Sequence, residues 1–226
     1  MKSNKNTARI AGALYLLVII FGVFAEKYVR ASLIDIENNE KTISNILEHE
    51  FLFRLGFLSD LGMQFAYFLL AMFLYRILKN INEWIAKTML LSVCIAVAIM
   101  CINMLNHYAP LLLLSSTIES TINTKNLIVF YVQMHSQGYH IAQLFFGFCL
   151  LPLGYLILKH KGFPKIIGYL LMIGCIGYLL DFALYFLSPG ASKNLSEYIT
   201  APADLGEISL CIYLLVIGVK LKSTES

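Results

Sequence analysis

The chain alternates long apolar stretches with short polar connections. Each apolar stretch is near the roughly 20 residues that an α-helix needs to cross the hydrocarbon core of a bilayer. Lipid cannot hydrogen-bond to backbone polar groups, so these groups must be satisfied within the segment, and such stretches are expected to be helical. We therefore predict an all-α fold, a polytopic membrane helix bundle with 1–226 as a single integral membrane domain. The six predicted transmembrane helices lie at about 8–29, 55–77, 88–115, 127–158, 165–187 and 202–219.

The longest polar connection, IDIENNEKTISNILEHE, carries a helical pattern of its own. Ile43, Ile46 and Leu47 share one face, which predicts a short amphipathic helix. Pro164 and Pro202 are expected near helix starts, where the missing proline N–H costs little.

The composition explains why the apolar stretches need a bilayer. The chain is 58% hydrophobic and 14% charged, with a mean hydropathy of +0.72, whereas soluble domains are about 45–50% apolar and ~25% charged. Lys and Arg lie at the ends of segments rather than along one stripe, so the lipid bilayer is the expected partner and no nucleic acid is. The five cysteines lie in apolar segments without a CxxC pair, which indicates neither a disulfide framework nor a cysteine metal site.

The basic residues orient the predicted bundle. Eleven of the seventeen lie at the N-terminus, in the second and fourth connections, and in the C-terminal tail. By the positive-inside rule, both termini are therefore expected in the cytoplasm. The first 25 residues also have the general form of a signal peptide, but their apolar stretch exceeds the usual 7–15 residues. We expect a retained first span.

Ionisable side chains recur at one depth. Counting 1.5 Å per residue from the cytoplasmic end of each span places at least one such group in the outer third of every span. Glu26, Arg30, Arg54 and His107 also fit a simple interface role, whereas the short carboxylates cannot reach water from this depth. The carboxylates are Asp60, Asp181 and Glu207.

The segment FYVQMHSQGYHIAQLFFGF, at 130–148, is the most polar part of this layer. A helix that is polar on both sides cannot be surrounded by lipid, so the fourth span is expected to be central, between neighbouring helices and a water-filled cavity. On a helical wheel, His135 points nearly opposite to the other polar side chains, which are Gln133, Ser136, Gln137, His140 and Gln143.

Two pairs of segments are alike. SDLGMQ (59–64) and ADLGEI (203–208) both open spans that run inward, and ARIAGALYLL (8–17) and PKIIGYLLMI (164–173) both open spans that run outward. These matches suggest a parallel repeat of spans one and two by spans five and six, and duplicated halves are common in transporters.

Several segments together carry a family resemblance: ARIAGALYLLVIIFG, FRLGFLSD, MHSQGYHIAQLFFGF, GYLIL followed by PKIIGYLL, GYLLD, and APADLGE. In this order they cover essentially the whole chain, and they resemble the bacterial domain-of-unknown-function family numbered 4386. The resemblance implies a multi-pass protein of the bacterial inner (cytoplasmic) membrane and supplies no activity. It also implies that Arg54, Asp60, His135, Asp181 and Glu207 matter, because they fall within the family-like motifs.

We expect these same five residues to converge as a ligand-binding site in an outward-facing polar cavity. Clustered acids favour a cationic or proton-coupled small ligand, so the predicted function is small-molecule or ion binding, or transport. No cofactor and no metal ligands are predicted, and catalytic residues stay unknown.

Two other functions remain open. An intramembrane metal-dependent hydrolase acting on lipid would hold Zn²⁺ and a bound water with His135, His140 and a carboxylate. No HExxH motif occurs, however, and the two histidines point apart. An accessory or regulatory membrane protein would use the polar layer only to hold its helices together. Motifs for a serine nucleophile, a phosphate loop or a dinucleotide are absent, so enzymatic activity stays an open question.

Overall fold

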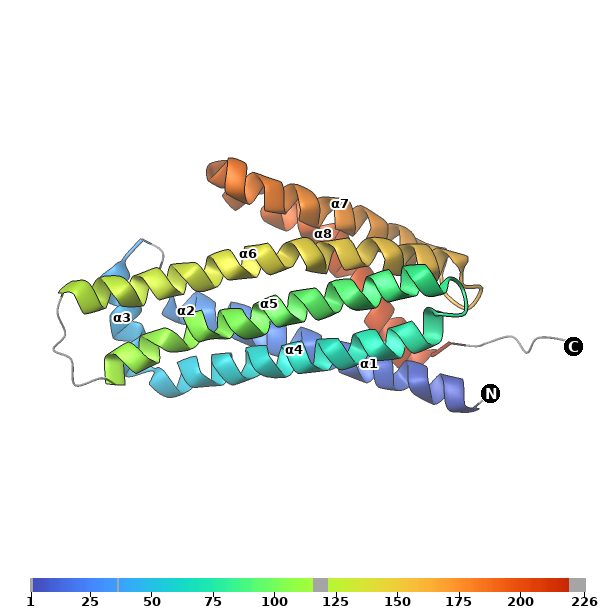
Figure 1. The fold of residues 1–226 in the computed structure, drawn as a ribbon, viewed down its shortest axis with the longest axis horizontal. Helices are drawn as coiled ribbons and strands as arrows, with labels where there is room; N and C mark the ends of the chain where they lie inside the picture. Colours follow the sequence, from blue (N-terminus) through green and yellow to red (C-terminus); the bar gives the residue numbers. More distant parts are fainter. Residues whose placement is uncertain (1, 36, 116–121, 220–226) are drawn as a thin grey trace, which may run out of the picture. The chain divides into compact units, whose positions relative to one another are not determined.

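A computed structural model describes residues 2–35, 37–115 and 122–219 (Figure 1). The described residues contain helices and no strand, which confirms the predicted all-α fold. In chain order the elements are α1 Lys2–Val23, the π-helix η1 Phe24–Arg30, α2 Ala31–Leu33, α3 Asn39–Glu48, α4 Glu50–Leu78, α5 Glu83–Ser115, α6 Ile122–Lys159, α7 Lys165–Leu187 and α8 Pro189–Val216.

Six helical segments among the described residues are long and apolar enough to cross a membrane, as the hydropathy pattern predicts. The chain is therefore a multi-pass membrane protein with a lipid environment. The six segments are Lys5–Leu33, Glu50–Leu78, Glu83–Leu114, Asn123–Lys159, Lys165–Leu187 and Leu195–Val216.

Of the two helix starts predicted from prolines, the one at Pro164 is confirmed and the one at Pro202 is wrong. Pro164 is the N-cap residue of α7, as expected. Pro202 lies inside α8, because that helix already begins at Pro189, which takes the favourable first-turn position. The polar stretch after Leu187, expected to be a connection, is therefore largely helical.

The predicted amphipathic helix is α3. Ile43 and Ile46 are buried, and Ile46 packs in a cluster with Val29, Leu33, Phe53 and Leu111. Leu47 was expected on the same face but is 53% exposed. The contact face of this short helix follows the spacing of Thr42, Ile43 and Ile46, and Leu47 lies one residue beyond its edge.

The chain divides into two compact units, which we describe separately. The first unit comprises Met1–Leu16, Ala66–Val97 and His140–Ser226, and the second comprises Leu17–Phe65 and Ala98–Tyr139. The single-domain organisation stays a prediction.

Helices α7 and α8 of the first unit pack side by side (Figure 1). Small residues allow the close approach, since a Cβ atom added to Gly174 would lie 2.5 Å from the Cα atom of Ala203. Gly12 similarly faces the backbone of Leu215.

The suggested internal repeat also stays a prediction. Its two matched aspartates have different surroundings: Asp60 is fully buried, whereas Asp204 is exposed. The likeness of the short motifs therefore does not extend to the burial of these two side chains.

Candidate functional site

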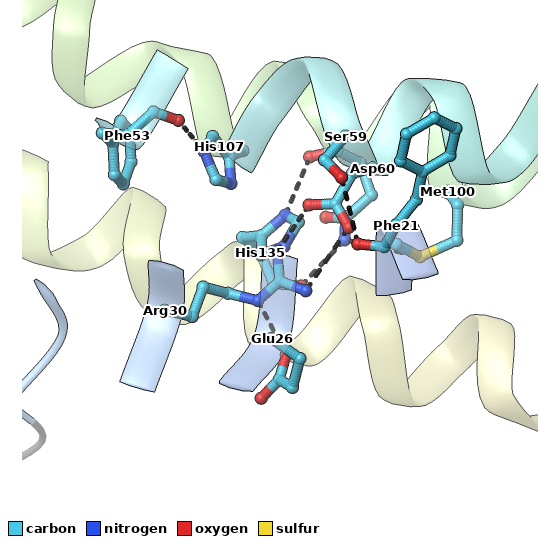
Figure 2. Close-up of polar contacts among 10 residues, drawn as sticks. Phe21, Glu26, Arg30, Phe53, Ser59, Asp60, Met100, His107 and His135 are labelled. Atoms are coloured by element: carbon cyan, nitrogen blue, oxygen red, sulfur yellow. Dashed lines mark hydrogen bonds and ion pairs between the residues drawn. The ribbon is translucent and has the colours of Figure 1, made fainter. Parts of the chain in front are cut away.

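A buried ion pair forms the centre of the second unit. Arg30 ends the π-helix η1, and Asp60 lies in α4. The Nη1 atom of Arg30 lies 2.5 Å from Oδ2 of Asp60, and Nη2 lies 3.4 Å from Oδ1 (Figure 2). The Asp60 side chain is inaccessible to solvent and that of Arg30 nearly so. Turns of π-helix are rare in proteins, and those that occur are often found at functional sites. The position of Arg30 at the end of η1 is therefore consistent with a functional role for the pair.

Arg30 is shared between two carboxylates. Its Nε atom donates a hydrogen bond of 2.7 Å to Glu26, one turn earlier in η1. The Glu26 side chain is 57% exposed, whereas Asp60 is fully buried. One guanidinium therefore links a buried acid to an acid that reaches the outside of the second unit.

Two buried histidines flank this ion pair. His107 lies in α5 and His135 in α6, and their rings meet edge to face with 5.1 Å between centroids. His107 Nε2 lies 3.3 Å from the carbonyl oxygen of Phe53, and His135 Nδ1 lies 3.4 Å from that of Asn103. A carbonyl oxygen only accepts, so each of these nitrogens carries the proton and donates.

The second unit brings three metal-binding side chains together. One donor atom from each of Asp60, His107 and His135 lies within 4.8 Å of the other two. Figure 2 shows Asp60 and His135 beside the Arg30 guanidinium, and His107 next to Phe53. Imidazole and carboxylate are ligands that divalent transition metals accept, so the arrangement could hold such an ion.

Polar packing behind His135 holds α5 against α6. Asn103 Nδ2 donates to the carbonyl oxygen of His135 at 2.8 Å, and Asn106 donates to Asn103 Oδ1 at 3.0 Å. A Cβ atom at Gly138 would overlap the Asn103 amide, so glycine leaves the space that this amide fills. The backbone around His135 is therefore fixed by a side chain of the neighbouring helix.

Arg54 is part of the second unit, but its contacts lie elsewhere. Its guanidinium bonds Glu50, one turn earlier, and donates to the Tyr108 hydroxyl at 3.2 Å. The side chain is 41% exposed. Arg30 is thus the positive charge on Asp60, whereas Arg54 bonds Glu50 and Tyr108.

Asp181 and Glu207 lie in the first unit. Gln143 Nε2 donates to Asp181 at 2.7 Å, and Gln143 Oε1 accepts from His140 Nδ1 at 2.9 Å. His140 also stacks on Tyr185, with 3.5 Å between ring centroids. His140 therefore contacts Gln143 and Tyr185, whereas His135 contacts Asn103.

Glu207 accepts a hydrogen bond of 2.9 Å from the hydroxyl of Tyr15. Tyr15 also lines a small pocket with Tyr67 and Cys149, whose hydroxyl and thiol lie 3.2 Å apart. The other residues around this pocket are Leu70, Ala71, Leu74, Met89, Val93 and Leu153, so its lining is mostly apolar.

The structure therefore joins Asp60 with His135, and it adds Arg30 and His107. The convergence of all five predicted residues stays a prediction. The depth count places His107 at the outer boundary and Arg30 just beyond it, and the four-residue spacing of Glu26 and Arg30 is a further signal. Their interface position made them hard to distinguish from ordinary snorkelling side chains.

Comparison with known proteins agrees with the resemblance seen in the sequence. The model of the family described as "Domain of unknown function (DUF4386)" matches residues 10–218. No curated protein and no solved structure matches the chain. Because the match covers nearly the whole chain, and its helices have the length and hydropathy of membrane spans, this protein belongs to the DUF4386 family.

Proposed function

We propose that this protein binds a small cationic or proton-coupled ligand at Asp60 and carries it into or across the bilayer. The membrane is the bacterial cytoplasmic membrane, with both termini in the cytoplasm. Asp60 and His135 form the core of the site, and Arg54 of the same unit is its proposed further member.

The observation that carries the proposal is the full burial of Asp60 within a membrane-spanning helix. An ionisable group inside a span is expensive, and it usually faces the bundle and marks a binding site or ion pathway. A buried ion pair is weak evidence for a stabilising role, because the desolvation of its two charges offsets much of their attraction. Stability alone therefore gives no reason for a charge at this position.

The sharing of Arg30 supports a site whose occupancy can change. Arg30 neutralises Asp60 while it also bonds the exposed Glu26. A cation that reaches Asp60 can therefore replace Arg30, which keeps a partner in Glu26.

A metal-dependent hydrolase acting on lipid is the second candidate function. It is favoured by the proximity of Asp60, His107 and His135, since catalytic zinc usually has three protein ligands and an open position. His107 replaces the expected His140, which bonds Gln143 instead. Release of fluorescent fatty acid from a labelled phospholipid, abolished by a chelator, would be the evidence for this activity.

Ligand binding can be tested by thermal unfolding of the detergent-purified protein with Na⁺, K⁺, spermidine or Zn²⁺, between about pH 5 and 8. A ligand at 100 times its Kd stabilises by about 2.7 kcal/mol, which raises Tm by roughly 5–10 °C for a chain of this size. We expect one of these cations, or the proton, to do so in the wild type and not in Asp60→Asn.

Glu48→Gln is the matched control, because it removes one negative charge from an exposed acid of the same unit. Carriage is measured in liposomes containing the protein and a trapped pH-sensitive dye. If no cation and no pH change affects the wild type differently from Asp60→Asn, the proposed function is wrong and the polar groups only hold the helices together.

A further inference from the structure

The donor atoms of the second unit discriminate between classes of cation. Na⁺, K⁺ and Mg²⁺ are held mainly by oxygen atoms, whereas two imidazoles with one carboxylate suit a divalent transition metal. We propose that Asp60, His107 and His135 bind such a metal, with Zn²⁺ as its probe, and that Arg30 is the counter-ion that the metal displaces. This inference rests on the proposed function and names its ligand class.

The hydrogen bonds of the two histidines leave one nitrogen of each ring able to bind a metal. His107 Nε2 donates to the carbonyl oxygen of Phe53, and His135 Nδ1 donates to that of Asn103. Each neutral ring therefore keeps a lone pair on its other nitrogen, Nδ1 in His107 and Nε2 in His135. A metal-binding histidine almost always donates its second ring N–H to a carbonyl, carboxylate or water, which fixes its tautomer.

The spacing of the donors is close to that of a metal centre. Ligand atoms about 2.0–2.1 Å from a tetrahedral Zn²⁺ lie about 3.4 Å from one another. The three donor atoms lie within 4.8 Å of one another here, so binding requires them to approach by up to about 1.4 Å. Three ligands leave the fourth position open for water or a transported group.

Arg30 and Glu26 explain how the charge of the metal is accommodated. Without metal, one guanidinium faces two carboxylates, so Glu26, Arg30 and Asp60 together carry one negative charge. A divalent ion bound to Asp60 would repel Arg30. The Nε atom of Arg30 already donates a hydrogen bond to Glu26. Arg30 can then move fully onto Glu26, and the exposed acid stabilises the displaced cation.

Metal content is the first test. The full chain is stripped with a chelator in detergent, dialysed against buffered Zn²⁺, and analysed for bound metal by mass spectrometry. We expect one Zn²⁺ per chain, lost in Asp60→Asn and in His135→Gln. His140→Gln is the matched control on the same helix, and it should retain the metal because His140 bonds Gln143 instead. Co²⁺ absorption bands in the visible range report direct nitrogen and oxygen coordination.

Affinity variants test the displacement of Arg30. Arg30→Gln should bind Zn²⁺ at least about tenfold more tightly, because it removes a competing positive charge a few ångströms away. Glu26→Gln should bind more weakly, because Arg30 loses its alternative partner. If Arg30→Gln is poorly stable without metal, the rise in its Tm on adding Zn²⁺ should exceed that of the wild type. Unchanged or weakened binding by Arg30→Gln would overturn the displacement.

Failure of this inference is distinguishable from failure of the proposed function. If Zn²⁺ does not bind, or if Asp60→Asn and His135→Gln bind it as the wild type does, the metal site is wrong. An Asp60-dependent response to Na⁺, spermidine or pH in the same samples would then leave the proposed function standing. If none of these responses is seen, both proposals are wrong.

Discussion

The guanidinium of Arg30 lies 2.5 Å from the carboxylate of Asp60, although the two residues are 30 positions apart and belong to different spans. The pair is unequal, because Asp60 has no exposed surface while Arg30 also bonds the exposed Glu26. The energetic consequences of breaking the pair should therefore differ for its two members.

Arg30→Gln should destabilise the protein more than Asp60→Asn. Removing one member of a buried ion pair typically costs about 3–5 kcal/mol, because a buried charge is left without compensation. Arg30→Gln leaves Asp60 in that state, whereas Asp60→Asn leaves Arg30 with Glu26. Thermal and denaturant unfolding in detergent would measure the two costs in metal-free buffer.

The double variant provides the check on this prediction. Arg30→Gln combined with Asp60→Asn should cost less than the sum of the single variants, because no unpaired charge remains. Strictly additive costs would mean that the two side chains do not interact energetically.

Gly138→Ala should destabilise the second unit by about 1–3 kcal/mol, the usual cost of overpacking. The added methyl group would overlap the Asn103 amide, which bonds the backbone of His135. Gly190→Ala is the control, since a Cβ atom there meets nothing within 4 Å. Equal Tm values for Gly138→Ala and the wild type would contradict the α5–α6 contact.

The stability of the protein should decrease below about pH 6.5 through His160, which lies in the connection between α6 and α7. Burial lowers the pKa of His160 from its ordinary value of 6.5. In addition, its Nδ1 atom accepts a hydrogen bond of 2.9 Å from the Gly162 N–H, which a proton there would abolish. The unfolded chain therefore binds the proton at higher pH than the folded one, so stability is complete above the unfolded pKa and decreases as pH falls toward the folded pKa.

His160→Asn tests this assignment, because the asparagine oxygen can accept the Gly162 hydrogen bond without titrating. As pH falls from about 8 to 5, the Tm of the wild type should decrease relative to that of His160→Asn. Parallel Tm profiles would assign the pH response to other groups.

The predicted orientation is testable by cysteine labelling. Glu37→Cys and Lys161→Cys, each made in a variant lacking the five native cysteines, would place a thiol at exposed positions in two different connections. A membrane-impermeant maleimide should label Glu37→Cys in intact cells and Lys161→Cys only after permeabilisation. The reverse pattern would place both termini outside the cytoplasm.

The fold was predictable wherever a local pattern controls the structure. Hydropathy identified all six spans, because a bilayer accepts only long apolar helices. The stripe of Ile43 and Ile46 identified α3. The start of α8 was predicted too late because the stretch after Leu187 is polar, although Pro189 permits a helix there.

The candidate site was only partly predictable. Asp60 and His135 could be selected because an ionisable side chain inside a span is costly in any arrangement. His107 could not be selected over His140, because both lie in apolar spans at similar depth. Their environments differ only through neighbours that are distant in sequence, Phe53 for His107 and Tyr185 for His140.

The hydropathy pattern is sufficient to predict an all-α membrane protein with six spans among the described residues, because transfer of apolar helices into lipid depends on each segment alone. The same pattern predicts the depth of Asp60 from the rise per residue. No local pattern, by contrast, shows that Arg30 neutralises Asp60 while Arg54 bonds Glu50 and Tyr108, because these contacts join residues of different helices or turns. The rotation of each helix and the choice of its neighbours depend on packing and hydrogen bonds between helices. Lipid is as apolar as the side chains that face it, so the hydropathy of one segment does not determine these contacts.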